Sequence, residues 1–165
     1  MSLSLYQVSV MPFIAELKIV SKLLTKGLEH VKGDESALIN ARIIEDMQPL
    51  TYQIQRISDT AKGLAVRMGK VEPVAMADEE KTFPELQERI TKTIAVLESV
   101  DPKSFEGIED KEVILATRAG EQKFTGLSYV NTFAIPNFYF HVCMVYAILR
   151  KEGVPVGKSD YLGRN

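Results

Sequence analysis

The amino-acid sequence predicts an all-α fold: a four-helix bundle with a small β-hairpin between its third and fourth helices. Two observations support this fold class. Apolar residues recur at alternating spacings of three and four along four separate stretches, which is typical of helices that pack in left-handed bundles. Strand character is confined to residues 112–126. Because 165 residues make one ordinary domain and no internal repeat is visible, we expect a single domain over residues 1–165.

The first helix is expected to begin near Val10. Its apolar residues lie at heptad spacing: Val10, Phe13, Leu17, Val20, Leu24 and Val31. Pro12 fits the first turn, where a missing N–H is harmless, so any helix before it should be kinked. Gly33 should end the helix, and Asp34 can cap a short turn around residues 37–41.

The second long helix is expected to begin near Pro49 and to end at Gly69. Its apolar residues again alternate spacings of four and three: Leu50, Ile54, Ile57, Ala61, Leu64 and Met68. The next stretch, residues 70–81, contains Pro73 and is predicted to be a polar connector.

The third helix has the clearest start signal in the chain. Thr82 followed by Glu85 is a capping-box pair, in which each side chain bonds a backbone N–H that the first turn leaves free. The apolar stripe of this helix is Leu86, Ile90, Ile94 and Leu97, and Pro102 should stop it.

A β-hairpin is predicted after this helix. Residues 112–117 and 122–126 read as two short extended runs around a glycine-containing turn at residues 118–121. Since an isolated hairpin is marginally stable, we expect it to lie against the helices.

The fourth helix should run from about Leu127 to Lys151 and be kinked or divided by Pro136. It is apolar over more than half its circumference, along two stripes: Phe133, Asn137, Phe140, Met144 and Ala147, and beside them Ala134, Phe138, His141, Val145 and Ile148. A helix with this pattern is predicted to be the buried element of the bundle. The tail after Gly153 should pack back on the body through Val154, Val156, Tyr161 and Leu162.

Composition and charge argue against several function classes. The net charge of −2, with basic residues interleaved among acids, does not suit nucleic-acid binding. No signal peptide is apparent, and no apolar run approaches the roughly 20 residues that span a bilayer. Cys143 is the single cysteine, so no internal disulfide can form. We therefore expect a soluble cytoplasmic protein.

Four blocks of the chain resemble the family called domain of unknown function 1993: "NARIIEDMQPLTYQ", "DTAKGLAVR", "EEKTFPELQERI" and "PNFYFHVCMVYAILRKEGVPVGKSDYLG". That family resembles, more remotely, the DinB/YfiT-like superfamily of four-helix bundles, many of which are expected to be metalloenzymes and many of which are dimers. In those relatives the last helix carries two histidines four residues apart, ahead of an "LR…G" ending. A third histidine comes from the second helix.

The resemblance places His141 on the second histidine of that pair and Asn137 on the first, by counting back from "LRKEGVP". The two lie one helical turn apart on a shared face. The second helix offers no histidine, only the polar candidates Asp46, Tyr52 and Gln53. Because an amide is a poor ligand for zinc or nickel, we expect no metal and no cofactor.

His141 has three possible roles: a hydrogen-bonded core residue, a polar pocket residue, or a metal ligand. Asn137 can instead satisfy backbone groups freed by Pro136. Asp46 can simply cap the second helix, and Cys143 can be an inert packing residue.

Two function classes follow from these alternatives. One is a small-molecule-binding or metal-independent enzyme pocket inside the bundle, for which the candidates are Asp46, Gln53, Asn137, His141 and Tyr146. The other is a non-enzymatic dimeric interaction or scaffold protein with no active site. In either case we expect a homodimer, because the fourth helix is too apolar for its neighbours to cover.

Overall fold

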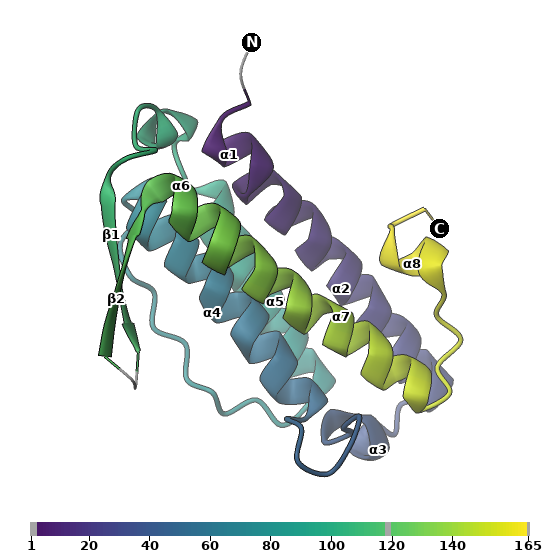
Figure 1. Ribbon diagram of the computed structural model, residues 1–165. Coiled ribbons are helices and arrows are strands. Elements are labelled where there is room, and N and C mark those ends of the chain that lie inside the picture. The colour runs from purple at the N-terminus through teal and green to yellow at the C-terminus, as the bar shows by residue number, and fades with distance from the viewer. Residues whose placement is uncertain (1–2, 118–119, 165) are drawn as a thin grey trace.

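Four helices of 16 to 21 residues lie side by side in the computed structural model, which describes residues 3–117 and 120–164 (Figure 1). They are α2 (Val10–His30), α4 (Leu50–Gly69), α5 (Phe83–Glu98) and α7 (Ile135–Lys151). Both α4 and α2 pack against α5 and α7. The prediction of a mostly helical fold with a small hairpin is confirmed.

Shorter helical segments join the long helices, extend them, or pack beside them. They are α1 (Leu5–Val8), α3 (Ser36–Ile39), η1 (Pro102–Phe105), α6 (Gly126–Ser128), η2 (Tyr129–Ala134) and α8 (Lys158–Tyr161). The described residues therefore hold more helical segments than the four that periodicity predicts. Segments of three to six residues span too few turns to show a heptad pattern.

The predicted heptad stripes form the hydrophobic core. On α2 and α4 they are fully buried: Val10, Phe13, Leu17, Val20, Leu24, Leu50, Ile54, Ile57, Ala61, Leu64 and Met68. Phe13 of α2 stacks on Phe138 of α7, with ring centroids 3.8 Å apart. Val31 is only half-buried because α2 ends at His30, which makes Val31 the C-cap.

The helix boundaries around the connector agree with the predicted signals. Helix α4 begins directly after Pro49 and ends at Gly69. At the start of α5, Thr82 Oγ1 accepts a hydrogen bond from the Glu85 N–H. Glu85 Oε2 in turn accepts from the Thr82 and Lys81 N–H groups. Local signals therefore mark both ends of the irregular segment 70–81, and a long-range hydrogen bond from the Phe83 N–H to Glu35 adds to the cap of α5.

The hairpin consists of β1 (Glu112–Thr117) and β2 (Gly120–Thr125), which pair antiparallel. Val113 and Leu115 are buried and alternate with exposed residues, so one face of β1 lies on the body. The second strand begins two residues before the predicted start. Residues 118 and 119, part of the predicted turn, lie outside the described residues.

The fourth helix, predicted to be kinked or divided at Pro136, runs without a gap from Gly126 to Lys151 but changes its hydrogen-bond pattern before the proline. After α6, the π-helical segment η2 continues to Ala134, and the Ile135 N–H bonds to the Val130 carbonyl five residues earlier. Pro136 lies in the first turn of α7. Because proline has no N–H and its ring crowds the carbonyl four residues back, a regular α-turn cannot run through this point.

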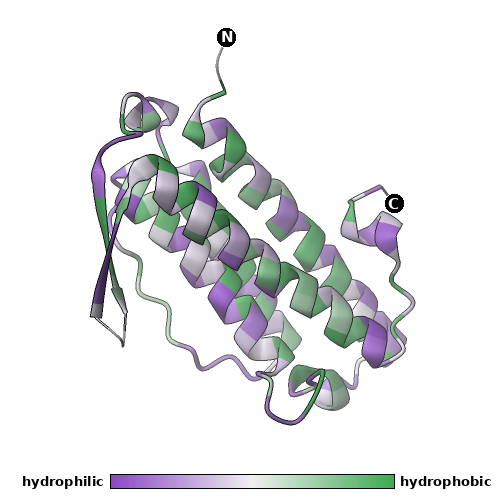
Figure 2. Ribbon diagram, in the orientation of Figure 1, coloured by the Kyte–Doolittle hydropathy of each residue, from purple (hydrophilic) through white to green (hydrophobic). Residues whose placement is uncertain are grey.

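One side of α7 is buried, as expected for a core element, and its other side is not covered by the neighbouring helices. The stripe Ala134, Phe138, His141, Val145 and Ile148 faces the core. On the opposite side Phe140 is 54% exposed and Cys143 is exposed. Figure 2 shows hydrophobic residues along both α2 and α7. The bundle therefore leaves apolar side chains of α7 uncovered.

By length and composition alone, Gly126–Lys151 could cross a membrane, contrary to the expectation that no stretch reaches this length. Thirty-nine per cent of its most apolar window is buried inside the protein. In the fold this stretch supplies one of the four packed helices, which is the simplest reason for its composition.

The C-terminal tail packs on the body as predicted for Val154, Val156 and Tyr161, whereas Leu162 is 39% exposed. Helix α8 lies beside α2, where Asp160 forms an ion pair with Lys26 (Figure 1).

Candidate functional site

A row of polar side chains lies between α4 and α7. His141 Nδ1 is 2.8 Å from Gln53 Oε1, and the Gln53 amide NH₂ donates to the Gln48 carbonyl at 2.9 Å. One turn earlier on α7, Asn137 Nδ2 donates to Thr60 Oγ1 at 2.7 Å. We call His141, Gln53, Asn137 and Thr60 the polar row.

The contacts of Gln53 determine the tautomer of His141. Since the Gln53 NH₂ group is directed to a carbonyl, its oxygen faces the imidazole and accepts a hydrogen bond from Nδ1–H. In a neutral ring the proton is then absent from Nε2, which is left as an acceptor. No hydrogen-bond partner for Nε2 occurs within residues 3–117 and 120–164.

Burial, together with the positive charge of Arg56, lowers the pKa of His141 to about 4. The imidazole is therefore neutral at physiological pH. Two aromatic rings meet it edge-on: Tyr52 at 6.2 Å and Phe140 at 5.1 Å between centroids.

Of the five predicted site residues, Gln53, Asn137 and His141 share the α4–α7 interface. Asp46 is exposed in the loop before α4. Tyr146 is half-buried, and its ring lies 5.8 Å from Tyr161 of the tail. Neither Asp46 nor Tyr146 forms a hydrogen bond or ring contact with the other three within the described residues: Asp46 lies in the α3–α4 loop, and Tyr146 contacts the tail.

The polar row does not suit a metal ion. It offers one imidazole and two amides, and its imidazole Nδ1 is already bonded to Gln53. Zinc and nickel prefer several imidazole or thiolate ligands. Within the described residues no cluster of three or more histidine, cysteine, aspartate or glutamate side chains could hold a metal.

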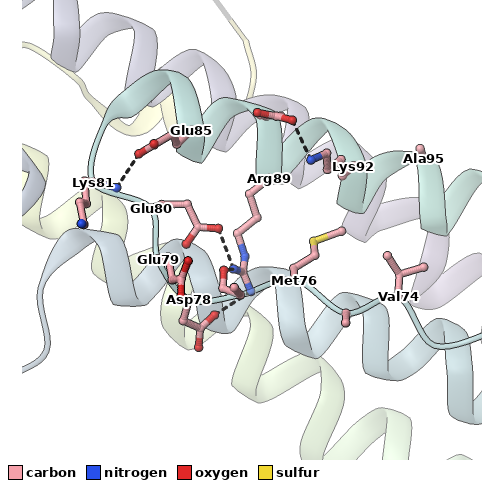
Figure 3. A pocket seen from close by; sticks show the side chains of 13 residues that line it. Val74, Met76, Asp78, Glu79, Glu80, Lys81, Glu85, Arg89, Lys92 and Ala95 are labelled. Carbon is pink, nitrogen blue, oxygen red and sulfur yellow. Dashed lines mark hydrogen bonds and ion pairs between the residues drawn. The ribbon is translucent and has the colours of Figure 1, made fainter.

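Two cavities flank the connector between α4 and α5, and neither has His141 in its lining. The larger, about 1150 Å³, lies between residues 74–81 and α5 (Figure 3). The smaller, about 310 Å³, lies at the start of α4 and includes Tyr52 and Gln55. Asp78, Glu80 and Lys81 line both cavities.

A second polar cluster lies where α2, α7 and the tail meet. Glu16 is 8% exposed, and its Oε1 has no hydrogen-bond partner within the described part of the chain. Burial raises the pKa of Glu16 to about 7. Burial, and then the nearby Glu16, raise the pKa of Tyr139. The pKa of Tyr161 is also raised, first by burial, then by its contact with Cys143, and further by Glu16.

The family assignment rests on nearly the whole chain. The model of the family described as domain of unknown function DUF1993 matches residues 5–162. The chain belongs to this family. It is thus a DUF1993 protein, as the four sequence blocks indicate. A comparison with curated proteins gives no match.

The DUF1993 chain is also similar to a solved structure, the crystal structure of a DinB family member protein from Shewanella denitrificans. The two share 35% identity with a TM-score of 0.87, over 96% of this chain and 92% of the other. This similarity agrees with the resemblance to the DinB-like superfamily, so the DUF1993 protein has a DinB-like fold.

Sequence reasoning missed the buried charged residues of this DUF1993 protein. Arg89 and Glu16 both adjoin apolar stripes and are buried, and the periodicity of the apolar residues gives neither of them a role. A charged residue beside a heptad stripe is normally exposed. The acidic run Asp78–Glu80 in the connector was the available signal for a buried partner of opposite charge.

Proposed function

We propose that this DUF1993 protein is a DinB-like four-helix bundle that binds a small molecule at the polar row, without a metal ion. The observation that supports this function most is the neutral His141, whose Nδ1–H is held by Gln53 while Nε2 is free to accept. Polar side chains on an apolar interface are costly to bury unless they are satisfied or used.

The free atoms of the row indicate the chemistry of the ligand. His141 Nε2 is an acceptor, and Asn137 keeps its amide oxygen as an acceptor because its NH₂ group is directed to Thr60. The flanking rings of Tyr52 and Phe140 suit a flat apolar body. We therefore propose an uncharged ligand with N–H or O–H donors.

A neutral imidazole with a pKa near 4 is a poor general base at physiological pH. The row is therefore better suited to binding a ligand by hydrogen bonds than to abstracting a proton from it. Any reaction at this site would need further groups from the ligand itself.

Chemical modification of the two histidines tests access to Nε2. Diethyl pyrocarbonate acylates neutral imidazole, and His30, which is exposed, serves as an internal reference. Mass spectrometry should show that His141 is modified more slowly than His30, but by no more than about a hundredfold. Such a rate is expected if Nε2 is partly shielded and still accessible to the reagent. If His141 reacts only when the protein unfolds, the row is sealed core and the binding function is rejected.

We also propose that the polar row is a metal site that has lost its ligands. Asn137→His would place two imidazoles one turn apart, and Gln53→His would add a third from α4, where Gln53 already meets His141. Zinc affinity, measured by calorimetric titration, should rise with Asn137→His and again with both changes. No increase in the correctly folded double variant would contradict this origin.

The alternative function, a dimeric interaction protein with no active site, has one observation in its favour. Apolar side chains of α7, including Phe140, remain exposed. Dimerisation is compatible with a ligand site, so we propose a homodimer as well. The free, exposed Cys143 is stable in a reducing compartment, which supports a cytoplasmic location.

A further inference from the structure

A cluster of six charged side chains holds the connector, residues 70–81, against α4 and α5. From the helices come Arg56, Lys62, Asp59 and Arg89, and from the connector come Asp78 and Glu80. Arg89 is the centre: its Nη2 lies 3.0 Å from Asp78 and its Nη1 lies 2.8 Å from Glu80 (Figure 3). Its Nη2 also lies 3.0 Å from Asp59 of α4. Arg56 also pairs with Asp78.

The helices alone would leave this cluster strongly positive. Arg56, Lys62 and Arg89 carry three positive charges, and Asp59 supplies a single negative charge from the same helices. Gln55 adds a further donor, through Nε2 to Glu80 Oε2 at 2.9 Å. The two carboxylates of the connector therefore neutralise an anion-binding arrangement that belongs to α4 and α5.

The cluster has more donors than acceptors even with the connector in place. Arg56 Nε and Arg89 Nε are both buried, and neither has a hydrogen-bond partner among the residues that the structure describes. The side chain of Arg89 is 1% exposed, so bulk water does not satisfy this N–H. Buried donors of this kind cost free energy, which an oxygen-rich ligand could relieve.

The connector has the properties of a movable cover. It has no helix or strand over residues 70–81, and most of its residues are exposed. Cavities of about 1150 and 310 Å³ lie on its two sides and share Asp78 and Glu80. Irregular segments of about this length in compact domains are commonly lids or binding loops. Displacement of residues 74–81 would join the two cavities above Arg89.

We propose that residues 74–81 form a lid over an anion site made by Arg56, Lys62 and Arg89, and that Asp78 and Glu80 occupy this site in place of a carboxylate- or phosphate-bearing small molecule. The site is separate from the polar row, and its failure would leave the proposed function untouched. Burial alone would raise the pKa of Glu80, but hydrogen bonds from Arg89 and Gln55 hold the pKa below its usual value. Glu80 is thus an ionised occupant.

The lid competes with a ligand because it is tethered beside the site. A tethered group acts at an effective concentration in the millimolar range, so a free anion of modest affinity is excluded until it exceeds that level. Removal of the two lid charges should therefore increase the apparent affinity for an anion by at least about tenfold.

The test uses Asp78→Asn with Glu80→Gln, which keeps the shape of the lid and removes its charges. Calorimetric titration at low ionic strength with inorganic phosphate, and separately with succinate, should show binding at least about tenfold tighter than to the wild type. Tighter binding of one or both anions supports the site and identifies its preferred group. If the folded double variant binds neither anion more tightly, the proposal is wrong.

Two further variants separate this site from a general charge effect. Glu79→Gln removes a neighbouring lid charge that makes no ion pair or hydrogen bond within the described residues, so phosphate affinity should stay within about twofold. Adding Arg89→Gln to the double variant should abolish the gained affinity. If Glu79→Gln and the double variant increase the phosphate affinity equally, the proposal is overturned.

The wild-type protein provides a test that does not depend on any variant folding. Phosphate should speed tryptic cleavage after Lys81, relative to chloride at the same ionic strength, because a displaced lid enters a protease site more readily than one held by ion pairs. Cleavage after Lys18 in α2, away from the site, should not change. Equal rates of cleavage after Lys81 in the two salts would contradict a lid that anions displace.

Discussion

Glu16 on α2 and His141 on α7 are both buried in their neutral forms, and burial shifts their pKa values in opposite directions. The carboxyl of Glu16 stays protonated up to about pH 7, whereas the imidazole of His141 stays unprotonated down to about pH 4. Both effects come from the cost of placing a charge inside the bundle. Their contributions to stability therefore have opposite pH slopes in overlapping windows.

Replacing Glu16 by Gln should stabilise the protein at neutral pH. Between about pH 4.5 and 7 the folded wild type binds a proton at Glu16 that the unfolded chain has released, so its stability falls as pH rises. Across this window, the free energy of unfolding of Glu16→Gln should rise by on the order of 2 kcal/mol relative to that of the wild type. Urea unfolding at several pH values measures the difference, and a constant difference would show that Glu16 ionises normally.

Replacing His141 by Gln should show the opposite slope. Between pH 6.5 and about 4 the unfolded chain binds a proton that folded His141 does not, so the wild type loses stability as pH falls. As pH falls over this interval, the free energy of unfolding of His141→Gln should rise by on the order of 2 kcal/mol relative to that of the wild type. The same urea series measures it. A gain that appears above pH 6.5 instead would contradict a depressed pKa.

At the scale of single elements, helix ends follow local chemistry. Thr82 and Glu85 cap the first turn of α5 within four residues of sequence, and the carboxylate of Glu35, from the region before α3, accepts a further hydrogen bond from the Phe83 N–H. The irregular connector before Thr82 and the regular helix after it meet at this cap, so the cap determines where the lid ends.

Loss of the α5 cap should cost stability. Thr82→Ala removes the acceptor for the Glu85 N–H and should lower the free energy of unfolding by about 1 kcal/mol. Thr91→Ala is a matched control, because Thr91 is exposed on the same helix and bonds only the Gln87 carbonyl behind it. Urea unfolding compares the two variants; equal losses would mean that the capping box contributes little.

At the scale of the whole molecule, the bundle leaves one helix partly uncovered. Helix α7 packs its core stripe on α2 and α4, while Phe140 on its other side is 54% exposed. Exposed aromatic residues beside an apolar helix face are typical of protein interfaces.

We predict a homodimer that buries on the order of 1,600 Å² in total through α7. Phe140→Glu should place a charge in that interface and convert the dimer to a monomer at micromolar concentration. Ile114→Glu, on the exposed face of the hairpin, is the control and should leave the mass unchanged. Light scattering measures all three proteins; a monomeric wild type would reject the dimer.

Three of the four residues of the polar row, His141, Asn137 and Gln53, were candidates from the sequence, and Thr60 was not. Asn137 and His141 lie on one helix, so their shared face follows from the helical repeat alone. The contact of Gln53 with His141 joins residues 88 positions apart, which local patterns do not encode. Asp46 and Tyr146 were assigned to the same site by polarity, and their positions depend on how a loop and a tail dock.

By itself, the sequence determined the fold class, the long helices, the capped start of α5, the hairpin and the irregular helical turn before Pro136. Each of these depends on residues close together in the chain, where periodicity and backbone chemistry act. Only the tertiary structure decided that Glu16 and Arg89 are buried, that α7 keeps an exposed side, and that the connector lies across α4 and α5. Burial and ion pairing depend on which helices become neighbours, and that packing brings together residues from distant parts of the chain.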